Sequence, residues 1–470
     1  MKRRTILAFL VLLIGVLAFA AAGCGGDDDD GDDAAPVATD GGDDGGDEGE
    51  KPDLPDVTAL PSASCTDIEY EGEGEPDVLI ASDLPLQGSS RTQTLQMIGA
   101  IRLVLEQNGW KAGNLNIGYQ SCDDSTAQAG KWDPGKTSQN ANAYAENASV
   151  LGVLGTFNSG AAAIMIPVLN QAPGGGLAML SPANTYVCLT EGGPGCADDE
   201  PDKYYPSGQR NYTRVVASDA YQGAALAEFM QAQGTTKLYI LNDKEAYGLG
   251  VATNVRNAAE HLGIEVVGFD AWDPKASNYE ALMRKAGQAG ADGLFLGGLI
   301  DENGAQVIKD KVAVLGPNDG DVKLYAPDGF TAQQTIDESG VENTRNAYFS
   351  VAGVPTDEFT GRGAEFVTEF EATLGGDPVD PYAVYGAQAA QIMLDAIAAS
   401  DGTRASVIEQ MFSVQVEDSF LGSFSFNENG DPQLASGAVL GFTIYRGEEQ
   451  LEVETVFSPS EENVDAARGL

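Results

Sequence analysis

The sequence predicts an α/β protein with two lobes, each built on a parallel sheet with helices on both faces. Short apolar runs typical of buried strands alternate with helical stretches along most of the chain. The alternation starts again near Val215, after a first complete series. Alternating strands and helices indicate a doubly wound parallel sheet, because parallel strands need a long crossover that is usually a helix. Two series in one chain therefore indicate two lobes.

The first series is predicted from its apolar runs and the turn residues between them. Val150 to Gly155 is rich in Val and Leu and long enough for one buried strand. Pro173 and the three glycines after it should end the helix that follows. Strands are expected at 77–81, 115–120, 150–155 and 177–180, and helices at 94–108, 137–147 and 161–169.

The second series has the same alternation and is followed by a helical stretch and a hairpin. Strands are expected at 237–241, 265–269, 293–297 and 322–326, and helices at 222–233, 250–262, 279–289 and 301–315. Three further helices are expected at 362–374, 382–399 and 404–412. A hairpin should turn at 427–431, before last strands near 438–445 and 450–457.

Small polar residues follow two neighbouring strands of the first series. Asn158 and Ser159 come after one strand, and Ser181, Ala183 and Thr185 end or follow the next. Ligands of open parallel sheets bind beyond the carboxyl ends of the strands. Ser159 also begins a helix, whose free N–H groups and dipole favour an anion such as a carboxylate. The alternative is a serine that only caps its helix.

The strand ends of the second series carry a complementary set. The predicted strands lead to Tyr247, Leu299 and Asp328. Each could be an ordinary solvated loop residue. Because all three lie at carboxyl ends, we expect them to face the cleft opposite Ser159 and Thr185.

The amino terminus is predicted to be a targeting segment. Three basic residues precede an apolar stretch that closes with small residues just before Cys24. Residues 1–23 therefore read as a signal peptide, and the cysteine directly after them resembles the acylated cysteine of a bacterial lipoprotein. The alternative is an uncleaved membrane anchor. Residues 24–64, rich in Gly and Asp, are expected to form an acidic, disordered tether.

The charge and the single histidine exclude several classes of function. The formal net charge is -45, which argues against a nucleic-acid partner. His261 is the only histidine and lies in an Ala-rich helical stretch, where a surface position is expected. We therefore expect no metal, no cofactor and no histidine-based catalytic triad.

The remaining four cysteines are an even number in an exported chain, which favours disulfides. Cys188 and Cys196 flank a Gly-Gly-Pro-Gly turn, and pairing them leaves Cys65 with Cys122. Three connectivities are possible, and sequence separation favours this one. Free buried thiols are the alternative.

Four segments in the same order and at similar spacing resemble the leucine/isoleucine/valine-binding proteins. They are GTFNSGAAA, SPANT, NDKEAYGLG and YAPDGF. Those proteins are type I periplasmic solute-binding proteins of ABC importers, and the resemblance covers roughly residues 77–457. It implies two lobes joined by three crossovers that close over a ligand: residues 65–213 and 353–436 form one, and 214–352 and 437–470 the other.

The resemblance also implies roles for the site residues. Ser159, Ala183 and Thr185 would hold an α-carboxylate, and Asp328 an α-ammonium where the family has Glu. Tyr247 would line the cleft. Two departures concern the ligand side chain: Leu299 stands where the family has Tyr, and Thr92 or Arg91 where an aromatic residue is usual.

The predicted function is capture of an amino acid or similar solute, without chemistry, by a protein anchored to the cell membrane through lipid on its extracytoplasmic side. The expected partners are ABC permease subunits. A ligand-sensing receptor subunit of the same fold is the first alternative. A secreted enzyme is the second, although no nucleophile–base pair is evident.

Overall fold

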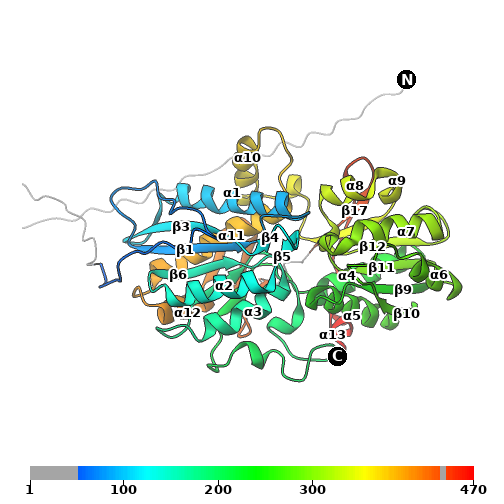
Figure 1. Cartoon of the computed structure of the whole chain (residues 1–470), viewed down its shortest axis with the longest axis horizontal. Helices are drawn as coiled ribbons and strands as arrows, with labels where there is room; N and C mark the ends of the chain where they lie inside the picture. Colours follow the sequence, from blue (N-terminus) through cyan, green and yellow to red (C-terminus); the bar gives the residue numbers. More distant parts are fainter. Residues whose placement is uncertain (1–50, 435–440) are drawn as a thin grey trace, which may run out of the picture. The chain divides into compact units, whose positions relative to one another are not determined.

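Two sheets with mostly parallel strands form the two lobes of the protein, as the sequence predicted (Figure 1). The structure is a computed structural model and describes residues 51–434 and 441–470. The strand orders are β2-β3-β1-β6-β7-β8 in the first lobe and β10-β9-β11-β12-β13-β17-β18 in the second. In each sheet the order reverses around an early strand, which creates the edge where doubly wound folds bind ligands.

The first lobe is doubly wound around β1. Its strands are β1 (Val78–Leu84), β2 (Lys111–Ala112), β3 (Leu115–Asp123), β6 (Val150–Gly155), β7 (Ala178–Ser181) and β8 (Tyr212–Arg214). Its helices are α1 (Arg91–Gln107), α2 (Pro134–Glu146), α3 (Ser159–Asn170), α10 (Arg362–Thr373), α11 (Pro381–Ala399) and α12 (Arg404–Ser413). Val78 and Ile80 pack with α1 and α11, whereas Leu79 and Ala81 pack with α2 and α3. Alternate residues of one strand thus serve opposite faces.

The second lobe repeats this arrangement around β9. Its strands are β9 (Lys237–Asn242), β10 (Glu265–Ala271), β11 (Gly293–Gly297), β12 (Lys323–Ala326), β13 (Tyr348–Ala352), β17 (Phe442–Gly447) and β18 (Leu451–Phe457). Its helices are α4 (Asp219–Ala232), α5 (Ala246–His261), α6 (Glu280–Gln288), α7 (Ala305–Leu315), α8 (Gln333–Ser339), α9 (Val341–Thr344) and α13 (Glu461–Arg468). Leu238 and Ile240 pack with α4 and α5, and Tyr239 and Leu241 with α6 and α7.

Three segments connect the lobes. The chain leaves the first sheet after Arg214, returns after β13, and passes through residues 435–440, outside the described part, before β17. Gly353 pairs with this last connection, because its N–H donates to Gly441 O over 2.9 Å and its carbonyl accepts from Thr443 N over 3.0 Å. A small sheet of β14 (Gln415–Ser419), β15 (Gly422–Phe426) and β16 (Pro432–Leu434) precedes it.

The sequence missed the shortest elements. Four missed elements have four residues or fewer: β4 (Ser125–Thr126), β5 (Lys131–Trp132), β8 and α9. Such short elements show too little periodicity to be recognised. The strand β13 and the helices α8 and α13, five to eight residues long, were also not predicted. The strand expected from residue 438 begins at Phe442.

Both predicted disulfides are present. Cys65 pairs with Cys122, and Cys188 with Cys196, with Cα–Cα distances of 3.9 and 5.5 Å. The first one fixes the segment 51–64 to the first lobe. In that segment, assigned from sequence to the tether, Leu60 is buried and its N–H donates to Gln120 Oε1 over 2.7 Å. The expected signal peptide, Cys24 and most of the tether lie outside the described residues.

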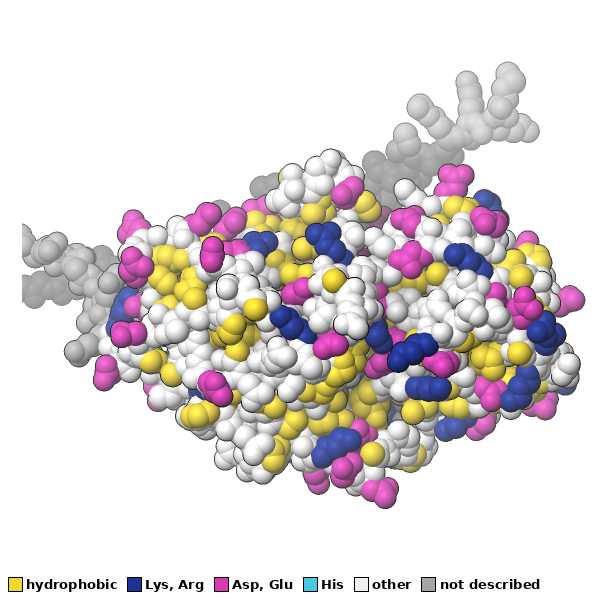
Figure 2. All heavy atoms as spheres, in the orientation of Figure 1, with side chains coloured by type: hydrophobic (Ala, Val, Ile, Leu, Met, Phe, Trp, Pro, Cys, Tyr) yellow, Lys and Arg dark blue, Asp and Glu magenta, His cyan; other side chains and the backbone are white. Residues whose placement is uncertain are grey.

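Among the helices of residues 51–434 and 441–470, none has the length and apolar character needed to cross a membrane. On the face seen in Figure 2, acidic side chains are spread widely rather than gathered into one patch. A spread of like charge favours solubility and does not define a binding surface.

Candidate functional site

One cavity lies where the strand ends of the two lobes face each other. Seven of the nine residues predicted from sequence to bind a ligand line it. They are Asn158, Ser159, Ala183 and Thr185 from the first lobe and Tyr247, Leu299 and Asp328 from the second. Its volume is about 20 Å³, and by this measure one water molecule needs about 10–15 Å³. In this structure the cavity therefore has room for about one water molecule and not for a larger solute.

The first-lobe wall is suited to an anion. Helix α3 begins at Ser159, and Asn158 rather than Ser159 is its N-cap, without a side-chain capping bond. The alternative reading, in which Ser159 only caps its helix, is therefore wrong. Ser159 Oγ instead accepts from Tyr186 N over 3.3 Å. Thr185 Oγ1 and Asn158 Oδ1 are buried and have no hydrogen-bond partner in the described chain. Free backbone N–H groups and unpaired polar atoms thus meet at one wall.

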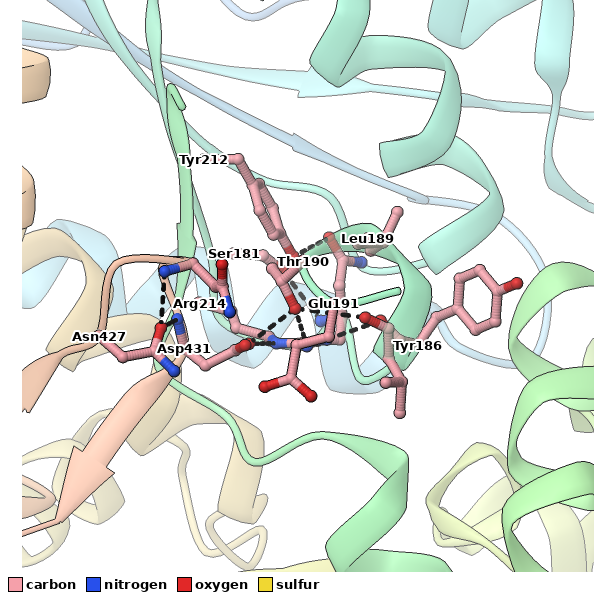
Figure 3. A network of polar contacts seen from close by, with 12 residues as sticks. Ser181, Tyr186, Leu189, Thr190, Glu191, Tyr212, Arg214, Asn427 and Asp431 are labelled. Atoms are coloured by element: carbon pink, nitrogen blue, oxygen red, sulfur yellow. Dashed lines mark hydrogen bonds and ion pairs between the residues drawn. The ribbon is translucent and has the colours of Figure 1, made fainter. Parts of the chain in front are cut away.

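Arg214 holds the loop that contains Tyr186 (Figure 3), the residue directly after Thr185 in the chain. The guanidinium is fully buried, and its Nη1 donates to Asn184 O over 3.1 Å and to Tyr186 O over 2.8 Å. These carbonyls stand on either side of Thr185. Arg214 Nε also donates to Asp431 Oδ1 over 2.6 Å, from the segment that leads to the last crossover. A buried ion pair therefore connects the loop that carries Thr185 with the segment that leads to the last crossover.

The second-lobe wall is suited to a cation. Asp328 Oδ1 accepts from the hydroxyl of Tyr247 over 2.5 Å, and Oδ2 accepts from the hydroxyl of Tyr382 over 2.5 Å. Burial raises the pKa of Asp328, and the two hydroxyls oppose that rise. The pKa values of both tyrosines are also raised, first by burial, so both stay protonated donors. An ammonium group would remove the cost of burying the carboxylate.

A second carboxylate, Asp219, lies near the first and was missed from sequence. It begins α4, is fully buried, and neither of its oxygens has a hydrogen-bond partner in the described chain. Its pKa is raised well above the ordinary value, first by burial and then by the charge of Asp328. Its N–H donates to Thr185 O over 2.8 Å. Two neighbouring acids strengthen the preference of this region for a positive group.

Asp243 orders the remaining second-lobe loops. Its Oδ1 accepts from Glu245 N over 2.9 Å, and its Oδ2 accepts from Leu299 N over 3.0 Å. Gly329 packs directly against these loops: a Cβ there would lie 2.4 Å from Gly298 O and 2.9 Å from Leu299 Cδ2. The backbone can approach this closely only because residue 329 is glycine.

Two predicted ligand residues lie outside the cavity. Ser181 is fully buried, donates to Thr156 O over 2.9 Å and accepts from Asn184 N over 2.9 Å, so its hydroxyl orders the loop. Thr92 is exposed in the first turn of α1 and accepts from Gln334 Nε2 over 2.7 Å. It therefore contributes to the contact between the lobes.

Six other lining residues were not identified from sequence as ligand residues: Trp132, Phe157, Gly160, Glu245, Gly329 and Tyr382. Trp132 comes from the unrecognised β4–β5 hairpin, and Tyr382 from the start of a helix far along the chain. Phe157 and Glu245 lie in loops that the sequence analysis had already placed at strand ends. Their position in the sequence was therefore sufficient to predict them as lining residues.

Two other features do not compete with this cavity. The first is a larger cavity of about 890 Å³, which is lined by segments that connect the lobes and by Gly441, next to residues 435–440 outside the described part. None of the predicted ligand residues lines it. In the described chain, one group has metal-ligand spacing: Cys188, Cys196 and Glu200. Both sulfurs are in a disulfide, so no metal site is assigned.

Two α/β lobes with a cavity between the carboxyl ends of their sheets define the type I periplasmic binding protein fold. A family model described as periplasmic binding protein matches residues 80–439. The chain belongs to this family of solute-binding proteins.

Individual relatives agree with this assignment. Leu/Ile/Val-binding protein homolog 1 of Brucella suis is 26% identical over 389 residues, covering 81% of this chain and 93% of that protein. The leucine-binding protein LivK of Thermotoga maritima superposes with a TM-score of 0.68 at 19% identity, covering 81% of this chain and 99% of the other. The isoleucine complex of LivJ from Streptococcus pneumoniae gives 0.65 at 14% identity, covering 81% and 99%.

Proposed function

We propose that this chain is an extracytoplasmic, lipid-anchored solute-binding protein that captures an amino acid or similar small solute and delivers it to an ABC importer. The observation that carries the proposal is that one wall of the cavity is suited to an anion and the opposite wall to a cation. The first lobe offers backbone N–H groups and the Thr185 hydroxyl, and the second offers Asp328. A zwitterion with its carboxylate and ammonium on one carbon matches both.

Binding would proceed by closure of the lobes, without chemistry and without a cofactor. Each lobe supplies one half of the site, so a ligand has its full set of contacts only in the closed state and shifts the equilibrium toward it. The relatives support the class of ligand, because their names specify leucine, isoleucine and valine. LivJ is described as the substrate-binding protein of a branched-chain amino acid transporter, which supports delivery of the ligand to permease subunits.

A thermal-shift screen tests the proposal. The full mature chain is heated with single amino acids, amides, short peptides and urea-like compounds. A ligand at 100 times its Kd adds about 2.7 kcal/mol to the unfolding free energy, which raises the melting temperature measurably. The proposal expects a shift with at least one α-amino acid and none with its α-keto acid, which lacks the ammonium. Shifts confined to compounds without an ammonium group contradict it.

A further inference from the structure

Trp132 reaches the cavity from outside the strand ends. It is the last residue of the β4–β5 hairpin, in which Ser125 pairs with Trp132 and Thr126 with Lys131. The indole is buried at 5% exposure and lines the cavity. It therefore forms a wall that neither lobe's strand ends provide.

The indole lies against the start of α3, one residue after Ser159. A Cβ added at Gly160 would be 2.7 Å from Trp132 Cζ2 and 3.0 Å from Cη2. Glu245 Oε2 of the second lobe would be 3.3 Å from the same point. The ring thus occupies the space above Gly160 that a side chain would otherwise fill, next to the proposed carboxylate anchor.

The residues on both sides of Trp132 fix this wall in place. Lys131 Nζ bridges Glu302 and Glu245 of the second lobe, the latter at 3.3 Å. On the other side, Asp133 caps α2 by accepting from Lys136 N over 2.9 Å, and its N–H donates to Asp124 O over 2.8 Å. These contacts hold the backbone of the hairpin on both sides of Trp132 in the closed state.

We infer that Trp132 determines the size of the ligand, so that the site takes α-amino acids with a small side chain, such as alanine, rather than branched-chain ones. The inference rests on the proposed function. The cavity of about 20 Å³ is far smaller than any amino acid, so the lobes must close less tightly around a ligand than they do in this structure. A larger side chain would keep the lobes further apart and forfeit the Lys131 bridge.

Calorimetric titration of the mature protein with L-alanine and L-leucine tests the inference. One methylene more or less on a ligand changes the preference of an apolar pocket between two ligands by about 10–200-fold. The wild-type protein should therefore bind alanine at least about tenfold more tightly than leucine. Trp132→Ala should bring the ratio to one or below, and Trp132→Phe should move it in the same direction by less. Melting curves of both variants establish that they fold.

Ser90→Ala is the matched control. Ser90 donates across the lobes to Asp301 but does not line the cavity. Its loss should weaken binding of both amino acids by the same factor and leave their ratio unchanged. A wild-type preference for leucine, or a ratio that Trp132→Ala and Trp132→Phe leave unchanged, overturns the inference while the proposed function stands. Failure of every amino acid to bind the wild-type protein overturns both.

Discussion

Tyr382 in the first lobe donates its hydroxyl to Oδ2 of Asp328 in the second, over 2.5 Å. The bond exists only when the lobes are closed, because the two residues belong to different lobes. It also orients the carboxylate that the proposed ammonium group would meet. One tyrosine thus contributes both to closure and to the geometry of the site.

Tyr382→Phe should weaken ligand binding by removing this contact from the closed state. A hydrogen bond to a charged group contributes about 1.5–3 kcal/mol, which corresponds to about a ten- to hundredfold rise in Kd. Calorimetric titration with the amino acid found by the screen measures it. Tyr385→Phe is the control, since Tyr385 is a buried tyrosine of the same helix for which no hydrogen bond to Asp328 is found. Equal affinities of the two variants would contradict this role of Tyr382.

The fold and much of the site could be predicted from the sequence because both depend on local signals. Apolar runs mark strands, and polar residues just after them mark the edge where open sheets bind ligands. Ser159, Thr185 and Asp328, chosen on that basis, line the cavity. Asp219 was missed because β8, the strand before it, is only three residues long. Tyr382 reaches the cavity through packing between segments distant in the chain, which no local pattern reveals.

Side-chain direction explains why two predicted ligand residues, Ser181 and Thr92, do not line the cavity. Ser181 ends β7 with its hydroxyl engaged by the backbone of its own loop. Thr92 lies in the first turn of α1, where its hydroxyl accepts from Gln334 of the second lobe. Both residues lie in segments close to the cavity, but their side chains point to other partners.

Lys311 should make stability depend on pH above neutrality. The side chain is fully buried, and its Nζ donates to Gly316 O over 3.1 Å and to Asn318 Oδ1 over 2.8 Å. Burial lowers its pKa from 10.5 to about 7. Between these values the unfolded chain holds the proton and the folded chain does not, so the unfolding free energy should rise with pH, by at most about 1.4 kcal/mol per unit.

Urea unfolding at pH 7, 8 and 9 measures this dependence. The Lys311→Met variant has no titrating group at this position, so its unfolding free energy should rise less steeply over the same range. Identical slopes for the variant and the wild-type protein would show that Lys311 remains charged in the folded state. Below pH 7 this residue should add no pH dependence, because both states then hold the proton.

Cys24→Ser should separate the mature protein from the membrane or leave its signal peptide uncleaved. The expectation comes from the apolar stretch and small residues before Cys24. Fractionation of cells that express each form, followed by mass determination, distinguishes the outcomes. Cys188→Ser serves as the control, because Cys188 lies in a disulfide of the folded body and should not affect anchoring. A Cys24→Ser protein that is still processed and membrane-bound would exclude the lipid anchor.

Asp328 and Thr185, the proposed partners of the ligand's two charges, should contribute very differently to ligand affinity. A zwitterion enclosed by the cleft needs both charges compensated, because a buried unpaired charge is costly. Asp328 is the lining carboxylate with tyrosine hydroxyls on both oxygens, whereas Thr185 adds one hydroxyl to a wall that also offers backbone N–H groups. Removing the partner of a buried charge costs about 3–5 kcal/mol, against about 0.5–1.5 kcal/mol for an ordinary hydrogen bond.

Asp328→Ala should therefore weaken binding more than about a hundredfold, and Thr185→Ala at most about tenfold. Calorimetric titration of both variants with the same amino acid compares them directly. Asp328→Asn separates charge from shape, since the amide keeps the size of the side chain and loses its negative charge, and it should behave like Asp328→Ala. If either Asp328 variant binds within a fewfold of the wild-type protein, the ligand carries no ammonium group at this position, and the assignment of the cavity to amino acids fails.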